Sequence, residues 1–355
     1  TLCRAQFPDK KYISLENPDV RLFATQDPRG FLDQFPEGGI LDEVQRTPEL
    51  FSYLQQILDE SETQGKFILT GSNNFLIQES ITQSLAGRIG YQQLLPLTIK
   101  EKKDAELFNA EINPNLITGF FPSIADKNLD PTRWYSNYIK TYVERDVRQI
   151  KNIVNLTSFT KFLQLCAGRV GQLLNANSLA TEVGMDNKTI SSWLGIFERS
   201  YVIFLLKPHH RNFNKRVVKM PKQYFTDVGL ASSLLGIKTI DQLETHPLRG
   251  NLFENMIVSD LWKTLLNRGE ENTLFFWRDN TGNELDLIWE HTNKLIPIEV
   301  KSGKTIVPDF FKGLNYWEKL SENSEGYVIY GGDAIQKRSS GKTVLPWHQA
   351  TNSIL

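Results

Sequence analysis

Residues 1–105 alternate short apolar runs with amphipathic segments. Three apolar runs have the length of buried strands: 11–15, 38–43 and 66–70. Between the second and third runs, residues 48–60 place leucine and isoleucine near helical spacing, which predicts an amphipathic helix. Strands separated by helices of this length are typical of α/β folds with a parallel, doubly wound sheet.

The next part of the chain has a helical pattern. Residues 106–160 are expected to form a helical connector. Residues 161–230 then contain two short helical segments joined at Gly184, followed by two extended segments at 202–206 and 217–225. This order is the outline of a winged-helix-like module. Its helix-turn-helix would need a small contact residue, a turn glycine and two apolar anchors, and these are Ala180, Gly184, Ile190 and Trp193.

Residues 231–355 predict an α+β domain, with a helix near 252–266 and several strands after it. Two of these strands flank His291-Thr292-Asn293. If Thr292 and Asn293 form a two-residue hairpin loop, the predicted cross-strand pairs are His291 with Lys294, Trp289 with Ile296, and Asp286 with Glu299.

This register sorts the side chains of the hairpin by chemistry. Asp286, Glu299 and Lys301 share one face, since directly opposed residues project together and residues two apart lie on the same side. The opposite face would be apolar and suited to packing on a helix; it comprises Leu285, Leu287, Trp289, Ile296, Ile298 and Val300.

Facing carboxylates with a nearby lysine fit metal-dependent phosphodiester hydrolysis. Carboxylate oxygens of Asp286 and Glu299 are hard ligands for Mg²⁺, and the ammonium of Lys301 would steady the nucleophile or the transition state. Glu254, on the preceding helix, could supply a third acid. A bare D…ExK string is nevertheless common in proteins that are not nucleases.

Composition and charge narrow the alternatives. The chain has 355 residues, 40% hydrophobic and 23% charged, with no apolar run long enough to cross a bilayer. Its two cysteines, Cys3 and Cys166, are too few for a disulfide scaffold or a four-thiolate zinc site. We therefore expect a cytoplasmic protein with no membrane partner.

A net charge of −1 means that DNA binding would need a local basic patch. The densest basic stretch comprises His209, His210, Arg211, Lys215, Arg216, Lys219 and Lys222. With Lys188 on the second helix of the helix-turn-helix, Arg211, Lys215 and Arg216 are the candidate nucleic-acid contacts. The alternative is a solvated β-hairpin or a surface for partner domains.

The second and third apolar runs end in polar residues typical of P-loop ATPases. Asp42 follows Ile40-Leu41 and is the candidate ligand of a Mg²⁺–nucleotide, and Glu43 would polarise the attacking water. Thr70 and Ser72 end the next strand, where they would lie near the nucleotide phosphates. Arg88 is a candidate arginine finger.

Several longer segments carry a family resemblance. They are GGILDEVQRTPEL, FILTGSNN, LAGRIGYQQLLPLT, GFFPS, TYVERDV, HHRNFNKRVVKMPKQYFTDVGLA and GNLFE. Together they resemble a prokaryotic AAA-type P-loop ATPase family that carries a nuclease-like C-terminal domain. The C-terminal acidic pattern looks like the PD-(D/E)xK nuclease superfamily, whose first acid, E-x-K motif and helix glutamate match Asp286, Glu299-Val300-Lys301 and Glu254.

The resemblance implies an ATPase core remnant over 1–105 and a restriction-endonuclease-like domain over 231–355. ATP and Mg²⁺ are the implied cofactors, and DNA and a homo-oligomer formed through the ATPase domain are the implied partners. Two functions stay open. One is ATP-dependent action on DNA with Mg²⁺-dependent cleavage, and the other is a DNA-binding or regulatory ATPase whose nuclease-like domain is an inactive docking module.

The phosphate-binding motif of this family, Gly-x-x-x-x-Gly-Lys-[Ser/Thr], does not occur in the 355 residues. The chain starts Thr1-Leu2, where that loop would finish, so we expect the ATP-binding form to be a longer protein. The backbone cradle and the lysine that hold the phosphates are not in this polypeptide.

This chain by itself should therefore show no melting shift with ATP and Mg²⁺. A ligand present at about 100 times its Kd stabilises a fold by roughly 2.7 kcal/mol, which differential scanning fluorimetry detects readily. A clear upward shift would contradict our interpretation of residues 1–105.

Overall fold

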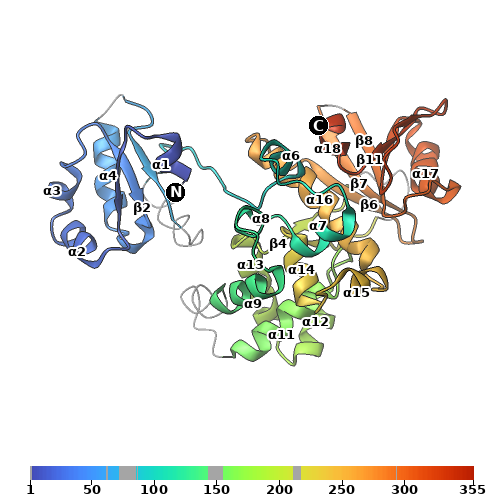
Figure 1. The fold of residues 1–355 in the computed structure, drawn as a ribbon, viewed down its shortest axis with the longest axis horizontal. Coiled ribbons are helices and arrows are strands. Elements are labelled where there is room, and N and C mark those ends of the chain that lie inside the picture. The colour runs from blue at the N-terminus through green and yellow to red at the C-terminus, as the bar shows by residue number, and fades with distance from the viewer. Residues whose placement is uncertain are drawn as a thin grey trace. The chain divides into compact units, whose positions relative to one another are not determined.

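The computed structural model describes residues 2–60, 63–71, 85, 87–142, 155–210, 217–292 and 294–355. The chain divides into two compact units, Thr1–Tyr91 and Gln92–Leu355, which are described separately (Figure 1). Among the described residues, no helix is both long and apolar enough to cross a membrane.

The first unit contains a three-stranded parallel sheet in the order β1-β2-β3. Its strands are β1 (Lys11–Ser14), β2 (Gly39–Asp42) and β3 (Phe67–Leu69). These are the three predicted apolar runs, and their parallel pairing confirms the predicted sheet type. Because β2 lies between the other two, Asp42 stands at the carboxyl end of the central strand.

Helices precede and connect these strands. They are α1 (Leu2–Gln6), α2 (Pro18–Gln26), α3 (Pro28–Leu32), the 3-10 turn η1 (Val44–Arg46) and α4 (Leu50–Asp59). Asn17 and Asp27 cap α2 and α3 by accepting hydrogen bonds from backbone N–H groups of the first turn, and a proline follows each cap. The predicted helix at 48–60 is α4, which buries Leu50, Phe51 and Leu54 in the core of this unit.

The first half of the second unit is mainly helical. Its helices are α6 (Ile99–Asp104), α7 (Ile112–Thr118), α8 (Pro122–Asp126), α9 (Pro131–Thr141), α11 (Leu156–Ala167), α12 (Ala176–Val183) and α13 (Asn187–Arg199). Gly184 ends α12 in the left-handed conformation that favours glycine, and Asp186 caps α13. The predicted helix, glycine turn and second helix are therefore present.

Two antiparallel strands follow, β4 (Ile203–Leu206) and β5 (Lys222–Phe225). After β5 come the helices α14 (Val228–Leu234), α15 (Ile240–Glu244) and α16 (Arg249–Asn267). The predicted extended segments correspond to this strand pair, with β5 shorter than the segment at 217–225.

The second half is built on a mixed sheet in the order β10-β11-β9-β8-β7-β6. Its elements are β6 (Leu274–Arg278), β7 (Glu284–His291), β8 (Lys294–Lys301), η3 (Pro308–Phe311), α17 (Lys312–Ser321), β9 (Gly326–Tyr330), β10 (Gln336–Lys337), β11 (Lys342–Pro346) and α18 (Ala350–Ile354). Residues of α16 share one core with one face of this sheet, and residues of α17 share another core with the opposite face (Figure 1).

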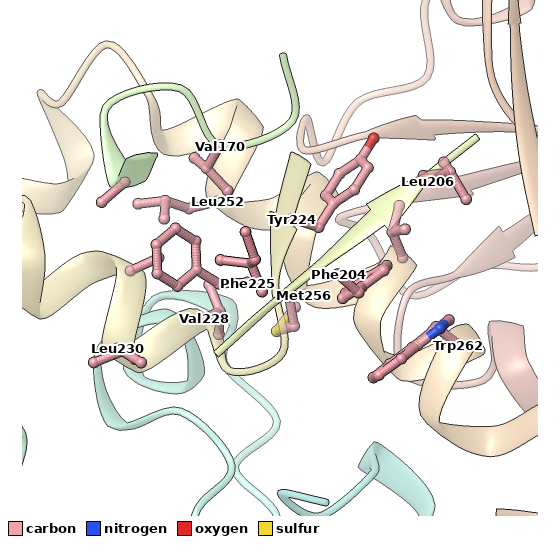
Figure 2. Close-up of a cluster of buried hydrophobic side chains, with 14 of the residues drawn as sticks. Val170, Phe204, Leu206, Tyr224, Phe225, Val228, Leu230, Leu252, Met256 and Trp262 are labelled. Atoms are coloured by element: carbon pink, nitrogen blue, oxygen red, sulfur yellow. The ribbon is translucent and has the colours of Figure 1, made fainter. Parts of the chain in front are cut away.

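One apolar core runs through most of the second unit, from Ile99 to Ile354. Figure 2 shows its centre, where side chains of β4 and β5 meet those of α14 and α16. Phe204 and Trp262 stack there with ring centroids 4.3 Å apart and planes 3° from parallel. The division at 106–160, 161–230 and 231–355 stays a prediction, and this core crosses those boundaries.

The hairpin of β7 and β8 has the predicted register. His291 pairs with Lys294, and Trp289 pairs with Ile296. The prediction that Leu285 shares a face with Leu287 and Trp289 is wrong. Leu285 packs in the α17 core, whereas Leu287 packs in the α16 core.

A β-bulge is the physical reason for this difference. Against β6, Ile288 pairs with Phe275 and Leu285 pairs with Trp277, so two residues of β7, Asp286 and Leu287, stand opposite one residue of β6. The extra residue reverses the alternation of side chains beyond it. Asp286 therefore lies at the bulge.

A buried aspartate ties the helices of the second unit to β5. Asp227, the N-cap of α14, accepts hydrogen bonds from the backbone N–H of Phe120 at 2.7 Å, from Tyr135 Oη at 2.5 Å and from the N–H of Leu230 at 2.9 Å. Gly119 lies against this cluster with φ 63° and ψ −153°, a region open almost only to glycine.

Gly119→Ala should destabilise the second unit by about 3 kcal/mol or more. An added Cβ would lie 2.1 Å from Tyr135 Oη and 2.5 Å from Asp227 Oδ1, so overpacking adds to backbone strain. Gly236→Ala is the control, because Gly236 also has a positive φ of 77° but nothing within 4 Å of the new Cβ; it should cost only about 1–2 kcal/mol. Equal losses in urea unfolding would refute the packing argument.

Candidate functional site

The three strand ends of the first unit converge on Asp42. Its carboxylate accepts hydrogen bonds from Tyr12 Oη at 2.8 Å, from Ser14 Oγ at 3.4 Å and from Thr70 Oγ1. Burial alone would raise the pKa of Asp42, but the hydrogen bonds from Thr70, Tyr12 and Ser14 outweigh it and hold the pKa below its ordinary value. The structure thus brings Asp42 and Thr70 together as an ionised carboxylate beside a hydroxyl.

Glu43 has a left-handed backbone, with φ 57° and ψ 41°. Its carboxylate accepts a hydrogen bond from Gln45 Nε2 at 2.8 Å and lies 3.8 Å from Arg46 Nε. A non-glycine residue in this conformation carries strain of order 1 kcal/mol, and such residues cluster at functional sites.

The structure does not place the other two predicted residues of the first unit, Arg88 and Ser72, in contact with Asp42. Arg88 forms an ion pair with Asp59, at the end of α4. Ser72 lies outside the described residues.

In the second unit, the structure brings the side chains of Asp286, Glu299 and Lys301 together. Asp286 Oδ2 accepts hydrogen bonds from the backbone N–H of Val300 at 2.9 Å and from Lys301 Nζ at 3.2 Å. Lys301 Nζ also donates to Glu299 Oε2, so the lysine contacts both acids. Two acids and one lysine therefore form a single contact cluster.

The two acids of this cluster are not equivalent. Burial and the negative charge of Asp286 raise the pKa of Glu299 well above its ordinary value. Burial would also raise the pKa of Asp286, but the positive charges of Lys301 and Lys222 and its hydrogen bonds lower it. The pKa values of the two carboxyls are thus shifted in opposite directions, as expected for neighbouring like charges.

Helix α17 closes one side of the cluster. A Cβ added at Gly313 would lie 1.7 Å from Glu299 Oε1, so only glycine allows α17 to approach this carboxyl so closely. Glu299 is accordingly only 3% exposed.

Glu254, the third predicted acid, lies in α16 and is held by β5. Its Oε1 accepts hydrogen bonds from Tyr224 Oη at 2.6 Å and from Lys222 Nζ at 3.1 Å. Lys222 Nζ also lies 2.5 Å from Glu284 Oε1, and its side chain is only 4% exposed. Burial would lower the pKa of Lys222, but the charge of Glu254 and further acidic neighbours raise it, so the lysine is charged.

Lys222, Tyr224 and Glu284 are site residues that sequence analysis missed. Lys222 belongs to the basic stretch of the sequence, but the structure buries this lysine and pairs it with two carboxylates. The available signal was the alternation of Lys222 and Tyr224 in a short strand, which puts both polar groups on one side of it.

An open polar pocket of about 430 Å³ adjoins this network. Its lining residues are Gly171, Gln172, Leu173, Lys222, Asn251, Glu254, Arg278 and Glu284. The pocket is therefore bordered by the loop before α12, by β5, by the start of α16 and by the facing ends of β6 and β7.

Of the three predicted acids, only Asp286 and Glu299 lie in positions that suit a shared Mg²⁺ ion. No group of three or more His, Cys, Asp or Glu side chains that could hold a metal occurs within the part of the chain that the structure describes. Mg²⁺ is commonly held by one or two carboxylates with water and substrate phosphates completing its shell. Asp286 and Glu299 supply such a pair, whereas Glu254 is engaged by Lys222 and Tyr224.

One of the four predicted nucleic-acid residues lies in the part of the chain that the structure describes. Lys188 is exposed in the first turn of α13. Arg211, Lys215 and Arg216 lie outside the described residues. His209 stands 3.5 Å from Glu290 and packs against Phe275, so the start of the basic stretch contacts the β6–β7 region.

Comparison with known families divides the chain into three matched segments. Residues 1–102 match the family described as an AAA domain. This match supports an AAA-type ATPase family. Residues 109–241 and 249–350 match two families described as domains of unknown function, DUF8612 and DUF4143. An AAA domain implies nucleotide binding, usually with Mg²⁺.

Curated relatives extend over much of the chain. Uncharacterized proteins of Mycobacterium tuberculosis and Mycobacterium bovis are each 29% identical over 265 residues, which is 75% of this chain and 58% of each relative. An uncharacterized protein of Haemophilus influenzae is 25% identical over 210 residues, covering 55% of this chain and 50% of that protein. The chain thus spans little more than half the length of these relatives.

Lys222→Met should destabilise the second unit by about 3–5 kcal/mol at neutral pH, because buried carboxylates lose their partner. Without the lysine, the pKa of Glu254 rises further above that in the unfolded chain. The penalty should therefore grow as the pH rises above about 4.3 and vanish below it, where the unfolded chain is protonated too.

Adding Glu254→Gln to Lys222→Met removes one of the two carboxylates left without their lysine. The double variant should therefore regain part of the lost unfolding free energy at pH 7. Lys238→Met, at an exposed position before α15, is the control. Chemical denaturation at pH 4 and pH 7 measures all four proteins. A pH-independent penalty for Lys222→Met would show that the ion pairs are not its cause.

Proposed function

We propose that this chain belongs to an ATPase that acts on DNA and that residues 231–355 form a Mg²⁺-dependent nuclease. The AAA match supports the ATPase part. The observation that carries the nuclease part is the contact cluster of Asp286, Glu299 and Lys301 at the predicted hairpin register.

In this proposal Asp286 and Glu299 hold the metal. Mg²⁺, when bound, supplies an activated water and neutralises charge on the leaving oxygen. The backbone N–H of Val300 fixes the orientation of the Asp286 carboxylate. Lys301, which contacts both acids, keeps a positive charge beside the reacting phosphodiester, and Glu254 stands in the adjoining pocket.

The nucleotide site of the proposed ATPase uses the strand ends of the first unit. Asp42, Thr70 and Ser72 would hold the Mg²⁺–nucleotide, and Glu43 would polarise the attacking water. The low pKa of Asp42 and its contact with Thr70 support this assignment. Arg88 would act as the arginine finger across a homo-oligomer interface.

The paired lysines favour a second candidate, an inactive docking module on a regulatory ATPase. Lys222 contacts Glu254 and Glu284, and Lys301 contacts Asp286 and Glu299. Each acid of the site is thus partly neutralised by an internal cation. A fold of this type does not by itself establish an activity.

Asp286→Asn and Glu299→Gln should each lower Mg²⁺-dependent DNA cleavage by at least about 100-fold, since each removes a metal ligand while keeping the side-chain shape. Lys301→Met should have an effect of similar size. Asp309→Asn, an exposed acid before α17, should cleave at the wild-type rate. The readout is cleavage of labelled single-stranded and duplex DNA with Mg²⁺ or Mn²⁺.

Isothermal titration with Mn²⁺ separates the two candidates. Metal binding by the wild type that is lost in Asp286→Ala, together with cleavage, supports the nuclease. Wild-type protein that leaves every DNA substrate intact would overturn the nuclease proposal and favour the docking module.

A further inference from the structure

The polar pocket beside the acid cluster contains a cation, Arg278, that uses only part of its hydrogen-bonding capacity. Arg278, at the end of β6, is paired in register with Glu284 and donates from Nη1 to Glu284 Oε2 at 3.1 Å. Its side chain is 38% exposed. No described residue accepts a hydrogen bond from its Nε or Nη2 groups. Several guanidinium donors are therefore available at the wall of the pocket.

The other charges of the pocket are held in place. Lys222 is bound by both Glu254 and Glu284, and its single positive charge offsets one of their two negative charges at the buried wall. Glu284 uses one oxygen for Lys222 and the other for Arg278. With Arg278 counted, the lining is balanced in formal charge, because Lys222 and Arg278 face Glu254 and Glu284.

The pocket also has the right size and position for a piece of a nucleic-acid strand. Its volume of about 430 Å³ lies within the range of small-molecule sites. A Cβ at Gly171 would stand 3.3 Å from Asn251 Nδ2 and 3.7 Å from Glu254 Oε1, so this glycine leaves the polar wall uncovered. Glu284 lies two residues before Asp286, which places the pocket next to the acid cluster.

We propose that Arg278 binds a phosphate group of the nucleic-acid backbone in this pocket and presents the strand to Asp286 and Glu299. A guanidinium matches phosphate with two parallel hydrogen bonds, and Arg278 keeps enough donors for them. This inference rests on the proposed function, because it names the substrate contact of the same site. Arg278 is a binding residue here and takes no part in bond cleavage.

The test is equilibrium binding of a fluorescein-labelled oligonucleotide, followed by anisotropy in EDTA, so that no cleavage is required. Arg278→Ala and Arg278→Gln should weaken binding about tenfold at fixed salt. The slope of log Kd against log salt should fall by about 0.7 for single strands or about 0.9 for duplex, the loss of one phosphate contact. Arg278→Lys should keep the slope and lose part of the affinity.

Arg268→Ala is the matched control. Arg268 is 42% exposed and is paired with Glu270 at 4.0 Å, so it resembles Arg278 in exposure and pairing but does not line the pocket. It should bind the oligonucleotide as the wild type does. Equal affinities and slopes for wild type and Arg278→Ala, or equal losses in Arg278→Ala and Arg268→Ala, would overturn the inference.

Two further arms identify the ligand and separate this inference from the proposed function. Inorganic phosphate or AMP that displaces the oligonucleotide at concentrations near the oligonucleotide's own Kd would show a site for free phosphate groups and overturn the strand assignment. Asp286→Asn should bind the strand like the wild type without cleaving it. Arg278-dependent binding without cleavage by the wild type would support the pocket and refute the nuclease. If cleavage requires Asp286 but binding does not depend on Arg278, the nuclease is supported and the phosphate-binding role of Arg278 is refuted.

Discussion

The ion pairs of Lys222 with Glu254 and Glu284 are the constraint on which the second unit depends. One ammonium group joins β5, α16 and β7, three elements far apart in the chain. A buried charge is tolerated only when its partners are in place, so these elements can pack in few alternative ways. The apolar core beneath, with Phe204 stacked on Trp262, supplies the burial that makes this pairing obligatory (Figure 2).

The bulge in β7 gives the acid cluster its shape. It places Asp286 where two residues of β7 face one residue of β6. Leu285 and Leu287 consequently serve different cores on the two faces of the sheet. Between those cores, the Asp286 carboxylate contacts the next strand at Val300 and Lys301. In a regular strand, Leu285 and Leu287 would lie on the same face, and Asp286 would not stand at a bulge between the two faces.

The two candidate sites differ in how charge is handled. In the first unit, hydroxyl groups of neighbouring strand ends stabilise Asp42 as an anion, which suits a nucleotide-bound cation. In the second unit, Lys301 pairs with Asp286 and Glu299, while burial and the charge of Asp286 raise the pKa of Glu299.

The sequence by itself determined what depends on neighbours along the chain. The hairpin register followed from a two-residue loop and from period-two alternation, and the two helices joined by a glycine turn followed from Gly184 and the apolar positions Ile190 and Trp193. Only the tertiary structure decided which distant groups meet. Glu254 contacts Lys222 and Tyr224, which are 32 and 30 residues away in the sequence. The face on which Leu285 lies depends on how β7 pairs with the neighbouring strand β6. Local patterns carry no record of such pairings, because burial and ion pairing act between elements that only the complete fold brings into contact.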